Sequence, residues 1–301
     1  MLTTLIGSRL SPQRKTNNKR LPAALLFFLV INQYATAEDH SIILWTRNYD
    51  TAPVDKILQL ALDKTPDLLP ATQIQRSRAM EYDEAIHSLL TEDGDITVLS
   101  AASSVSNDTE LLAIRFPVLK GLLGYRLCLI RKNEQALFAN IVTLHDFMES
   151  DLQICQGSEW PDTAILRRNG LPLATSQSYS NLFDMLSNKQ CDCFLRGAQE
   201  IIPERDSWHT QFEIEKSLVL FYAQPGFFYV NKSNPQLAAR IELGLLRALD
   251  DGSYHQLFSQ LMGAQLEELD LENRAVLQLA NPIPSDANIS SQKMKKLWYS
   301  L

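Results

Sequence analysis

The stretch Ser41-Ile-Ile-Leu-Trp45, followed by a helical pattern from Ala52 to Lys64, sets the rhythm of the whole chain. A short apolar run of this kind predicts a buried strand, and apolar residues three and four positions apart predict an amphipathic helix. The alternation returns with a helical pattern over 82–90 and the buried strand Asp95-Ile-Thr-Val-Leu99. Strands that alternate with helices are typical of an α/β fold.

A second series of strands and helices occupies the middle of the chain. It begins at Leu152-Gln-Ile-Cys155 and ends with the strand 191–195. The alternating segment Tyr125–Arg131 leads into this middle part, and a single long strand over Ser217–Val230 leads out of it. We therefore predict two lobes joined by two crossover strands that act as a hinge. Residues 38–129 and 216–301 form the predicted first lobe, and residues 130–215 form the second.

The chain after Val230 predicts one long helix over Pro235–Asp250 and, later, an irregular tail. From Leu266 onward the sequence is acidic and then contains prolines, which interrupt helices and strands. We expect this tail to pack along the first lobe.

The first 37 residues have the order of a secretory signal peptide. A leader with five basic and no acidic residues precedes the apolar run 21–31, and Ala35-Thr36-Ala37 supplies small side chains before Glu38. A transmembrane anchor is the alternative, but a helix needs about 20 apolar residues to cross a bilayer, and this run has 11. We predict cleavage after Ala37 and export to the periplasm, without a lipid anchor because no Cys stands at the cleavage site.

Without the leader, the chain is acidic. The whole sequence has 28 Lys and Arg residues, and removing the five of the leader leaves 23 against 35 Asp and Glu, a formal charge of −12. Proteins that hold nucleic-acid phosphates carry clustered basic residues, so we expect no nucleic-acid partner. The length and the 45% hydrophobic content allow one large or two modest domains with a packed core.

Four cysteines lie after the leader: Cys128, Cys155, Cys191 and Cys193. An oxidising compartment permits disulfides, and we expect a single bridge, between Cys155 and either Cys191 or Cys193. Alternate residues of a strand share a face, so Cys191 and Cys193 are not expected to bridge each other. Buried, unpaired cysteines are the alternative. A zinc site is not expected, because the Cys-Asp-Cys spacing lacks the two-residue gap of a zinc knuckle.

Sequence motifs for catalysis are absent. The five histidines are scattered without metal-ligand spacing, and the sequence contains neither a Gly-x-Ser-x-Gly elbow nor a glycine-rich phosphate loop. A carboxylate run such as Glu267-Glu-Leu-Asp270 is typical of a solvated helix face. We therefore expect a protein that is not an enzyme and that uses neither a metal nor a cofactor.

Five stretches of the sequence, taken together, resemble one known family. The first two are Asn234-Pro-Gln-Leu-Ala-Ala-Arg-Ile-Glu-Leu-Gly-Leu245 and Ala248-Leu-Asp-Asp-Gly-Ser-Tyr-His-Gln-Leu-Phe258, and the other three are 114–126, 156–162 and 191–197. The first two resemble the closing helices of bacterial extracellular solute-binding proteins of family 3, which are type 2 periplasmic binding proteins. The other three resemble a poorly characterised subgroup of that superfamily.

This resemblance implies a function. Proteins of that family are two-lobed clamps that capture a small solute and hand it to an ABC-type membrane transporter, here expected to act as a monomer. A periplasmic sensor that uses the same clamp to signal to a membrane partner is the alternative. The superfamily also contains hydratase-like enzymes and peptidoglycan-cleaving proteins, and the latter need an additional catalytic domain for which this chain has no room.

Several residues are placed where a clamp would hold its solute. Trp45, at the end of the first strand, is the candidate aromatic wall of the cleft, with a core position as the alternative. Ser100 and Ser103 follow a buried strand, where their hydroxyls would face a crevice or simply form a turn. Gln156-Gly157-Ser158 follows another strand and precedes a helix. Its backbone amides and the helix dipole could hold an anion, with a plain capped helix as the alternative.

Arg196 makes an α-amino-acid ligand doubtful. The amino-acid binders of the family place an acidic residue for the ligand ammonium where this chain has Arg196. They also place an Arg for the ligand carboxylate where this chain has Asn107-Asp-Thr-Glu110. Because Arg offers a bidentate fork to carboxylate or phosphate, Arg196 indicates a small polar ligand with an anionic group. An ion pair with Glu200, one helical turn later, is the alternative role.

Overall fold

The strands form two groups in the computed structural model of the chain, which describes residues 41–50, 53–68, 73–91, 94–208, 210–281 and 297–299. All of these residues belong to one compact unit, Asp39–Leu301. The leader expected at 1–37 and its cleavage site lie outside the described residues. No helix within the described ranges is long and apolar enough to cross a membrane.

The first group of strands combines a parallel pair with an antiparallel sheet. Strand β1 (Ile42–Leu44) pairs in parallel with β2 (Ile74–Arg76). Strand β11 (Gly226–Val230) lies between β3 (Leu99–Ala102) and β4 (Leu112–Ile114) and is antiparallel to both. A single parallel bridge between Leu44 and Val98 connects the pair to the sheet. The group therefore joins residues from both ends of the chain.

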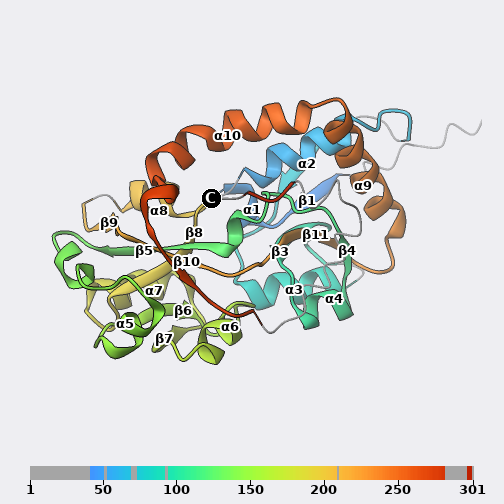
Figure 1. The fold of residues 1–301 in the computed structure, drawn as a ribbon. Helices are drawn as coiled ribbons and strands as arrows, with labels where there is room; N and C mark the ends of the chain where they lie inside the picture. Colours follow the sequence, from blue (N-terminus) through green and yellow to red (C-terminus); the bar gives the residue numbers. More distant parts are fainter. Residues whose placement is uncertain are drawn as a thin grey trace, which may run out of the picture. The chain divides into compact units, whose positions relative to one another are not determined.

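Six helices accompany this first group: α1 (Thr46–Asp50), α2 (Val54–Asp63), α3 (Tyr82–Leu90), α4 (Val105–Glu110), α9 (Pro235–Asp250) and α10 (Ser253–Leu269). Helix α9 begins at a cap in which Asn234 accepts a hydrogen bond from the Leu237 amide. It packs on α2 (Figure 1), and Gly244 permits the close approach, since a β-carbon there would lie 1.9 Å from the Ala61 carbonyl oxygen. The helices expected near 52–64, 82–90 and 235–250 are therefore confirmed.

The second group is one seven-stranded sheet. Its main path runs β12 (Ala275–Gln278), β10 (Leu218–Phe221), β5 (Tyr125–Arg131), β8 (Cys193–Gly197), β6 (Ile154–Gly157) and β7 (Leu173–Ser176), and β9 (Phe212–Ile214) also pairs with β5. Helices α5 (Leu144–Glu149), α6 (Thr163–Arg168), α7 (Tyr179–Ser187) and α8 (Ile201–Ser207) belong to this part of the chain. Short 3₁₀ turns lie at Leu122–Gly124, Gln135–Phe138 and Leu271–Asn273.

The prediction of one long strand over 217–230 is wrong. The structure divides it into β10, in the seven-stranded sheet, and β11, in the first group. The break includes Pro225, which has no N–H to donate to a strand ladder. In the same break, the hydroxyl of Tyr222 donates to Asp162. The segment 222–225 therefore passes from one group of strands to the other.

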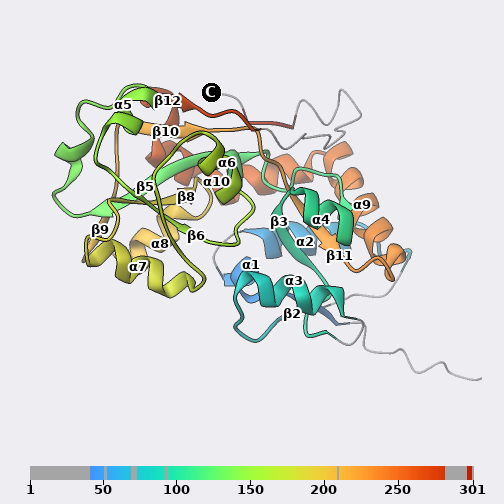
Figure 2. The ribbon, with the colours of Figure 1, turned by 90° about the horizontal axis from the view of Figure 1, so that it is seen from below.

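The expectation of an irregular tail is wrong for residues 275–278. They form β12, which pairs in parallel with β10 from Leu218↔Ala275 to Phe221↔Gln278, and Figure 2 shows the two strands side by side. Leu277 is buried in the core of the second group, which gives the tail an apolar anchor. Both β10 and β12 fall within the ranges predicted for the first lobe but pair with the sheet of the second.

Two disulfides cross-link the seven-stranded sheet, so the expectation of a single bridge is wrong. Cys128 of β5 pairs with Cys193, and Cys155 of β6 pairs with Cys191, which is one of the two pairings left open by the sequence. Cys191 and Cys193 lie in different hydrophobic clusters rather than on one face. The reason is that the amides of Asp192 and Cys193 both donate to the Gln153 carbonyl, which breaks the alternation just before β8.

Candidate ligand-binding site

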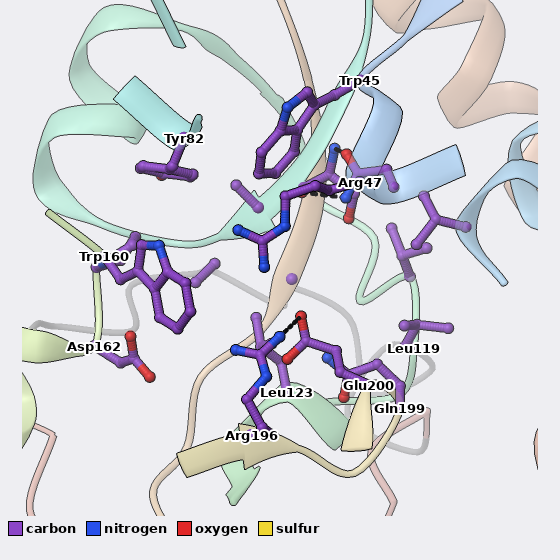
Figure 3. Close-up of a pocket in the computed structure, with 18 of the residues that line it drawn as sticks. Trp45, Arg47, Tyr82, Leu119, Leu123, Trp160, Asp162, Arg196, Gln199 and Glu200 are labelled. Atoms are coloured by element: carbon purple, nitrogen blue, oxygen red, sulfur yellow. Dashed lines mark hydrogen bonds and ion pairs between the residues drawn. The ribbon is translucent and has the colours of Figure 1, made fainter. Parts of the chain in front are cut away.

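A cavity of about 110 Å³ lies between the two groups of strands (Figure 3). The first group contributes Trp45, Arg47, Tyr82 and Ser100, and the second contributes Arg126, Trp160, Asp162, Arg196, Gln199 and Glu200. Val118, Leu119 and Leu123, from the segment before β5, form an apolar side of the wall. The cavity therefore combines charged, amide and apolar surfaces.

The side chain of Arg47 spans the cavity. Arg47 belongs to α1, and its guanidinium carbon lies 3.8 Å from the ring centre of Tyr179 and 5.3 Å from that of Trp160, both in the second group. It also lies 5.4 Å from the ring centre of Trp45. Burial, and then the positive charge of Arg196, lower the pKa of Arg47. A negatively charged group beside Arg47 would therefore be stabilised there.

Arg196 is held by two carboxylates. Its Nε and Nη2 donate to the two oxygens of Glu204, each at 2.6 Å, and Nη2 lies 3.0 Å from Glu200 Oε1. Burial by itself lowers the pKa of Arg196, but the charges of Glu200 and Glu204 outweigh it and raise this pKa. The alternative role of Arg196, an ion pair with Glu200, is present, and Glu204 supplies a stronger, bidentate contact.

The carboxylate of Glu200 lies among three arginines. Burial would raise the pKa of Glu200, but the charges of Arg196, Arg126 and Arg47 outweigh it and lower this pKa. Oε2 of Glu200 also accepts a hydrogen bond of 3.1 Å from the Gly197 amide. Glu200 is therefore ionised and fixed in the wall of the cavity.

Arg126 and Asp162 form a second buried ion pair, with 2.7 Å between Nη2 and Oδ2. The hydroxyl of Tyr222 accepts from Arg126 Nε at 2.9 Å and donates to Asp162 Oδ2 at 2.8 Å. Nε2 of Gln156 donates to the other oxygen of Asp162 at 2.8 Å. The network joins β5, β6 and the crossing segment 222–225, so it fixes this side of the cavity near the link between the two groups.

Among the predicted residues of the first group, Trp45 and Ser100 line the cavity and Ser103 does not. Trp45 is also a core residue, and its Nε1 donates to the Met80 carbonyl. The backbone of Ser100 exchanges two hydrogen bonds with the Asn48 side chain. The hydroxyl of Ser103 donates to Asp108, which is the turn chemistry considered as its alternative. Trp45 therefore lines the cavity and is also part of the core, and its role as a wall for the solute stays a prediction.

The segment Gln156-Gly157-Ser158 does not line the cavity. The amide of Ser158 donates to the Ser176 carbonyl, so it is not directed at a ligand. Helix α6 begins only at Thr163, several residues later than the anion-cradle interpretation needs. Gly157 instead leaves room for Trp160, because a β-carbon there would lie 2.4 Å from the indole ring. The segment thus positions Trp160 and Asp162, which do line the cavity.

Sequence reasoning missed Arg47, Tyr82 and Gln199 as wall residues. Arg47 stands two positions after Trp45, and its placement just beyond the first strand was the available signal. Tyr82 begins α3, and Gln199 follows β8 by two residues. Arg126, Trp160 and Asp162 lie in the stretches that carry the family resemblance, but nothing in their spacing indicated a common cavity.

No protein-family model and no curated protein sequence matches the chain. Solved structures do match it. An ancestral amino acid-binding protein, described as a precursor of cyclohexadienyl dehydratase, has a TM-score of 0.54 and 13% identity, over 73% of this chain and 94% of that chain. An amino acid ABC transporter substrate-binding protein from Streptococcus pneumoniae, bound to L-arginine, has a TM-score of 0.54 and 10% identity, over 74% and 93%.

The periplasmic VFT2 domain of BvgS from Bordetella pertussis is similar to the same degree, with a TM-score of 0.54 and 13% identity, over 73% of this chain and 92% of that domain. At such identities the similarity concerns the fold. The chain has the two-lobed α/β fold of type 2 periplasmic binding proteins.

Proposed function

We propose that this protein is a periplasmic solute-binding protein that captures a small polar solute between two lobes and passes it to an ABC-type transporter, acting as a monomer. The cavity supports this most directly, because both groups of strands supply its walls. Such a cavity encloses a solute when the lobes close and releases it when they open. The sequence predicts the lobes 38–129 with 216–301, and 130–215; we propose that β10 and β12 belong to the second lobe, because they pair with its sheet, and that the start of β5 and the segment 222–225 form the hinge.

The proposed solute carries an anionic group, and the proposed partner of that group is Arg47. The guanidinium of Arg47 points into the cavity among aromatic rings (Figure 3). Arg126 pairs with Asp162, and Arg196 pairs with Glu204 and Glu200. Arginine is suited to this role because its planar fork matches a carboxylate. Arg196 then acts as the support that holds Glu200 and Glu204.

We propose that the protein is not an enzyme. None of the histidines within the described ranges lines the cavity, and the described part of the chain contains no cluster of His, Cys, Asp or Glu that could hold a metal ion. The carboxylates of the wall, Asp162 and Glu200, are paired with arginines, which does not suit a general acid. A hydratase-like activity is the less favoured option, and it finds some support in the ancestral neighbour described as a dehydratase precursor.

A sensor role is the second candidate function. The observation that favours it is the similarity to the BvgS domain, which equals the similarity to the transporter component. In this case closure of the lobes would signal to a membrane partner instead of delivering the solute. Deleting the gene separates the two roles: uptake of the identified solute should fall if the protein serves a transporter, and should continue if it serves a sensor.

We also propose that residues 1–37 direct export to the periplasm and are removed before Glu38. The basic leader, the apolar run and the small residues before Glu38 support this. Mass spectrometry of protein from a periplasmic fraction should find a chain that begins at Glu38. An intact Met1, or recovery from the cytoplasm, would contradict the proposal.

The experiment for solute binding is a thermal-shift screen of the exported protein against small metabolites. A ligand at 100 times its Kd stabilises the folded state by about 2.7 kcal/mol, which raises the melting temperature by roughly 5–11 °C in a chain of this size. Arg47→Leu should remove the shift for anionic solutes, whereas Arg76→Leu, on an exposed arginine of β2 outside the cavity, should not. If no metabolite shifts the wild type, the solute-binding proposal fails.

A further inference from the structure

Within the described ranges, the chain crosses between the two groups of strands at three places. The first crossing is the turn 121–124 before β5, and the second is the segment 222–225 between β10 and β11. The third crossing, residues 270–274, connects α10 to β12. Arg274 fixes it, because this side chain donates to the last carbonyl of α10 at 2.7 Å and to the first carbonyl of β10 at 3.1 Å. The C-terminal part of the chain therefore belongs to both groups.

After β12 the chain continues along the second crossing. The amide of Leu279 donates to the Phe221 carbonyl at 2.8 Å, and Nδ2 of Asn281 donates to the Ala223 carbonyl at 2.7 Å. The side chain of Leu279 is buried, so the contact is apolar as well as polar. These residues therefore lie directly against the second crossing.

Residues 297–299 contact the first crossing. The amide of Tyr299 donates to the Lys120 carbonyl at 2.8 Å, and the carbonyl of Tyr299 accepts a hydrogen bond of 3.1 Å from the Tyr125 hydroxyl. Lys120 directly precedes the turn 121–124, and Tyr125 begins β5 of the second group. Tyr299 therefore bridges the residues on either side of the turn.

Aromatic rings connect the two crossings at the same place. The ring centre of Tyr125 lies 4.6 Å from that of Phe221 and 5.5 Å from that of Tyr299. The indole of Trp298 lies over Gly121, where a β-carbon would be 2.2 Å from it. Gly121 has a φ of 75°, and glycine can change its backbone conformation more easily than other residues. The rings therefore cover the part of the turn that is best suited to rotate.

We propose that residues 275–281 and 297–299 form a strap that restrains opening of the two lobes. Opening requires rotation within the turn 121–124, which would change the separation of Lys120 and Tyr125, and Tyr299 binds both. The strap thus favours the form present in this structure. This inference rests on the proposed hinge and needs no assumption about the solute.

The amide of Tyr179 reports opening, and its partner Glu81 is not part of the strap. This amide donates to Glu81 Oε1 at 3.2 Å, across the two groups. The amide of Asn181, in the same first turn of α7, donates to Ser178 Oγ within the second group. Opening therefore exposes the first amide to solvent and leaves the second unchanged. Hydrogen exchange at both amides can be followed by NMR on the purified protein without ligand.

Loss of the strap's rings should speed exchange at the Tyr179 amide. In Tyr299→Ala we expect an increase of roughly 2- to 12-fold, the factor that corresponds to one aromatic pair, and Trp298→Ala should act in the same direction. Tyr299→Phe is the matched control, because the strap uses the ring and the backbone of Tyr299, and it should exchange at the wild-type rate. The Asn181 amide should keep its rate in every variant, which shows that α7 stays folded.

Three results would overturn the proposal. The first is equal exchange of the Tyr179 amide in the wild type and in both alanine variants. The second is a wild-type amide that exchanges as fast as in Glu81→Ala, because the cleft would then be open despite the strap. The third is faster exchange at Tyr179 and Asn181 together, because the strap would then serve stability and not the hinge.

Failure of this inference is distinguishable from failure of the proposed function. The exchange experiment uses no ligand, so a strap without effect leaves the solute-binding function standing if the metabolite screen finds a solute. If the screen finds none, the solute-binding function fails, and the exchange rates still decide whether the strap restrains the hinge.

Discussion

Removing the Cys155–Cys191 bridge tests whether the disulfides stabilise the second group of strands. The bridge joins residues 36 positions apart, and the Cys128–Cys193 bridge joins residues 65 positions apart. All four cysteines are at most 1% exposed. We would replace each pair by alanine, because serine would bury a hydroxyl without a partner. The perturbation then removes the cross-link and little else.

The expected magnitude follows from the loop lengths. A bridge restricts the unfolded chain, and the loop-closure relation gives about 3.8 kcal/mol for the 36-residue separation and about 4.3 kcal/mol for the 65-residue separation. The 155–191 loop lies inside the 128–193 loop, so the remaining bridge still restricts the chain when one is removed. These values are therefore upper values for each single loss. Removing both should destabilise the protein by more than the two single losses added together.

Thermal and urea unfolding without reductant measure these losses. For each double variant we expect a loss of about 2–4 kcal/mol, which lowers the melting temperature by roughly 4–15 °C. The control is unfolding in excess reductant, where wild type and the four-alanine variant should differ only by the substituted side chains. If either double variant unfolds at the wild-type midpoint without reductant, the reasoning about loop closure is refuted.

Three further predictions concern single residues. Gly244→Ala should lower the free energy of unfolding by about 1–3 kcal/mol in urea, since overpacking would push α9 away from α2; an unchanged midpoint would contradict the close contact. The pKa of Glu200 is lowered in the fold, so its stabilisation is complete above the ordinary value of 4.5 and disappears as the pH falls through the lower, folded value. Glu200→Gln should therefore be less stable than wild type at pH 7, with a gap that narrows below about pH 4.5; a gap independent of pH would argue against this. Arg196→Lys should lose about 1.5–3 kcal/mol of stability, because lysine cannot pair with Glu204 through two bonds; solute affinity should hold within about twofold, and the reverse pattern would restore Arg196 as a ligand contact.

Sequence patterns predicted a helix or strand well where the signals for it lie within its own residues. The apolar run before Trp45 and the helix capped by Asn234 are of this kind, because the signals lie within a few residues. The division of 217–230 and the pairing of 275–278 depend on partners elsewhere in the chain. A four-residue strand with one buried leucine has no pattern of its own that separates it from a loop. Such elements become visible only when the partner strand is known.

The site shows the same limit at the level of single residues. Trp45 and Ser100 were predicted from their places at strand ends, and Arg196 from a comparison with the amino-acid binders of the family; all three line the cavity. The role of Arg196, however, is decided by Glu204, eight residues later in α8, whereas the sequence offered Glu200. Arg47 was missed because its neighbours Tyr179 and Trp160 lie more than one hundred positions away in the chain. A position at a strand end indicated that a residue lines a cavity. The role of its side chain there depends on contacts with residues that the sequence pattern does not reveal.

In the proposed clamp, Arg47 has two roles, one in closure and one in binding the solute, and a second residue separates them. Its contacts with Tyr179 and Trp160 cross between the two groups of strands, so opening of the proposed clamp would break them. The backbone amide of Tyr179 also donates to Glu81 Oε1 at 3.2 Å, and Glu81 does not line the cavity. Glu81→Ala therefore removes a closure contact and leaves the proposed binding groups intact.

A ligand shifts closure only by the difference between its affinities for the closed and open forms. The lost hydrogen bond of Glu81 contributes about 0.5–1.5 kcal/mol to the closed form. Its loss should therefore lower the binding affinity of every solute by the same factor, up to about tenfold. Arg47→Leu should weaken anionic solutes far more than neutral ones. If both substitutions lower the binding affinity for anionic and neutral solutes equally, Arg47 serves closure alone. The anionic group would then have to be bound by another residue of the cavity wall.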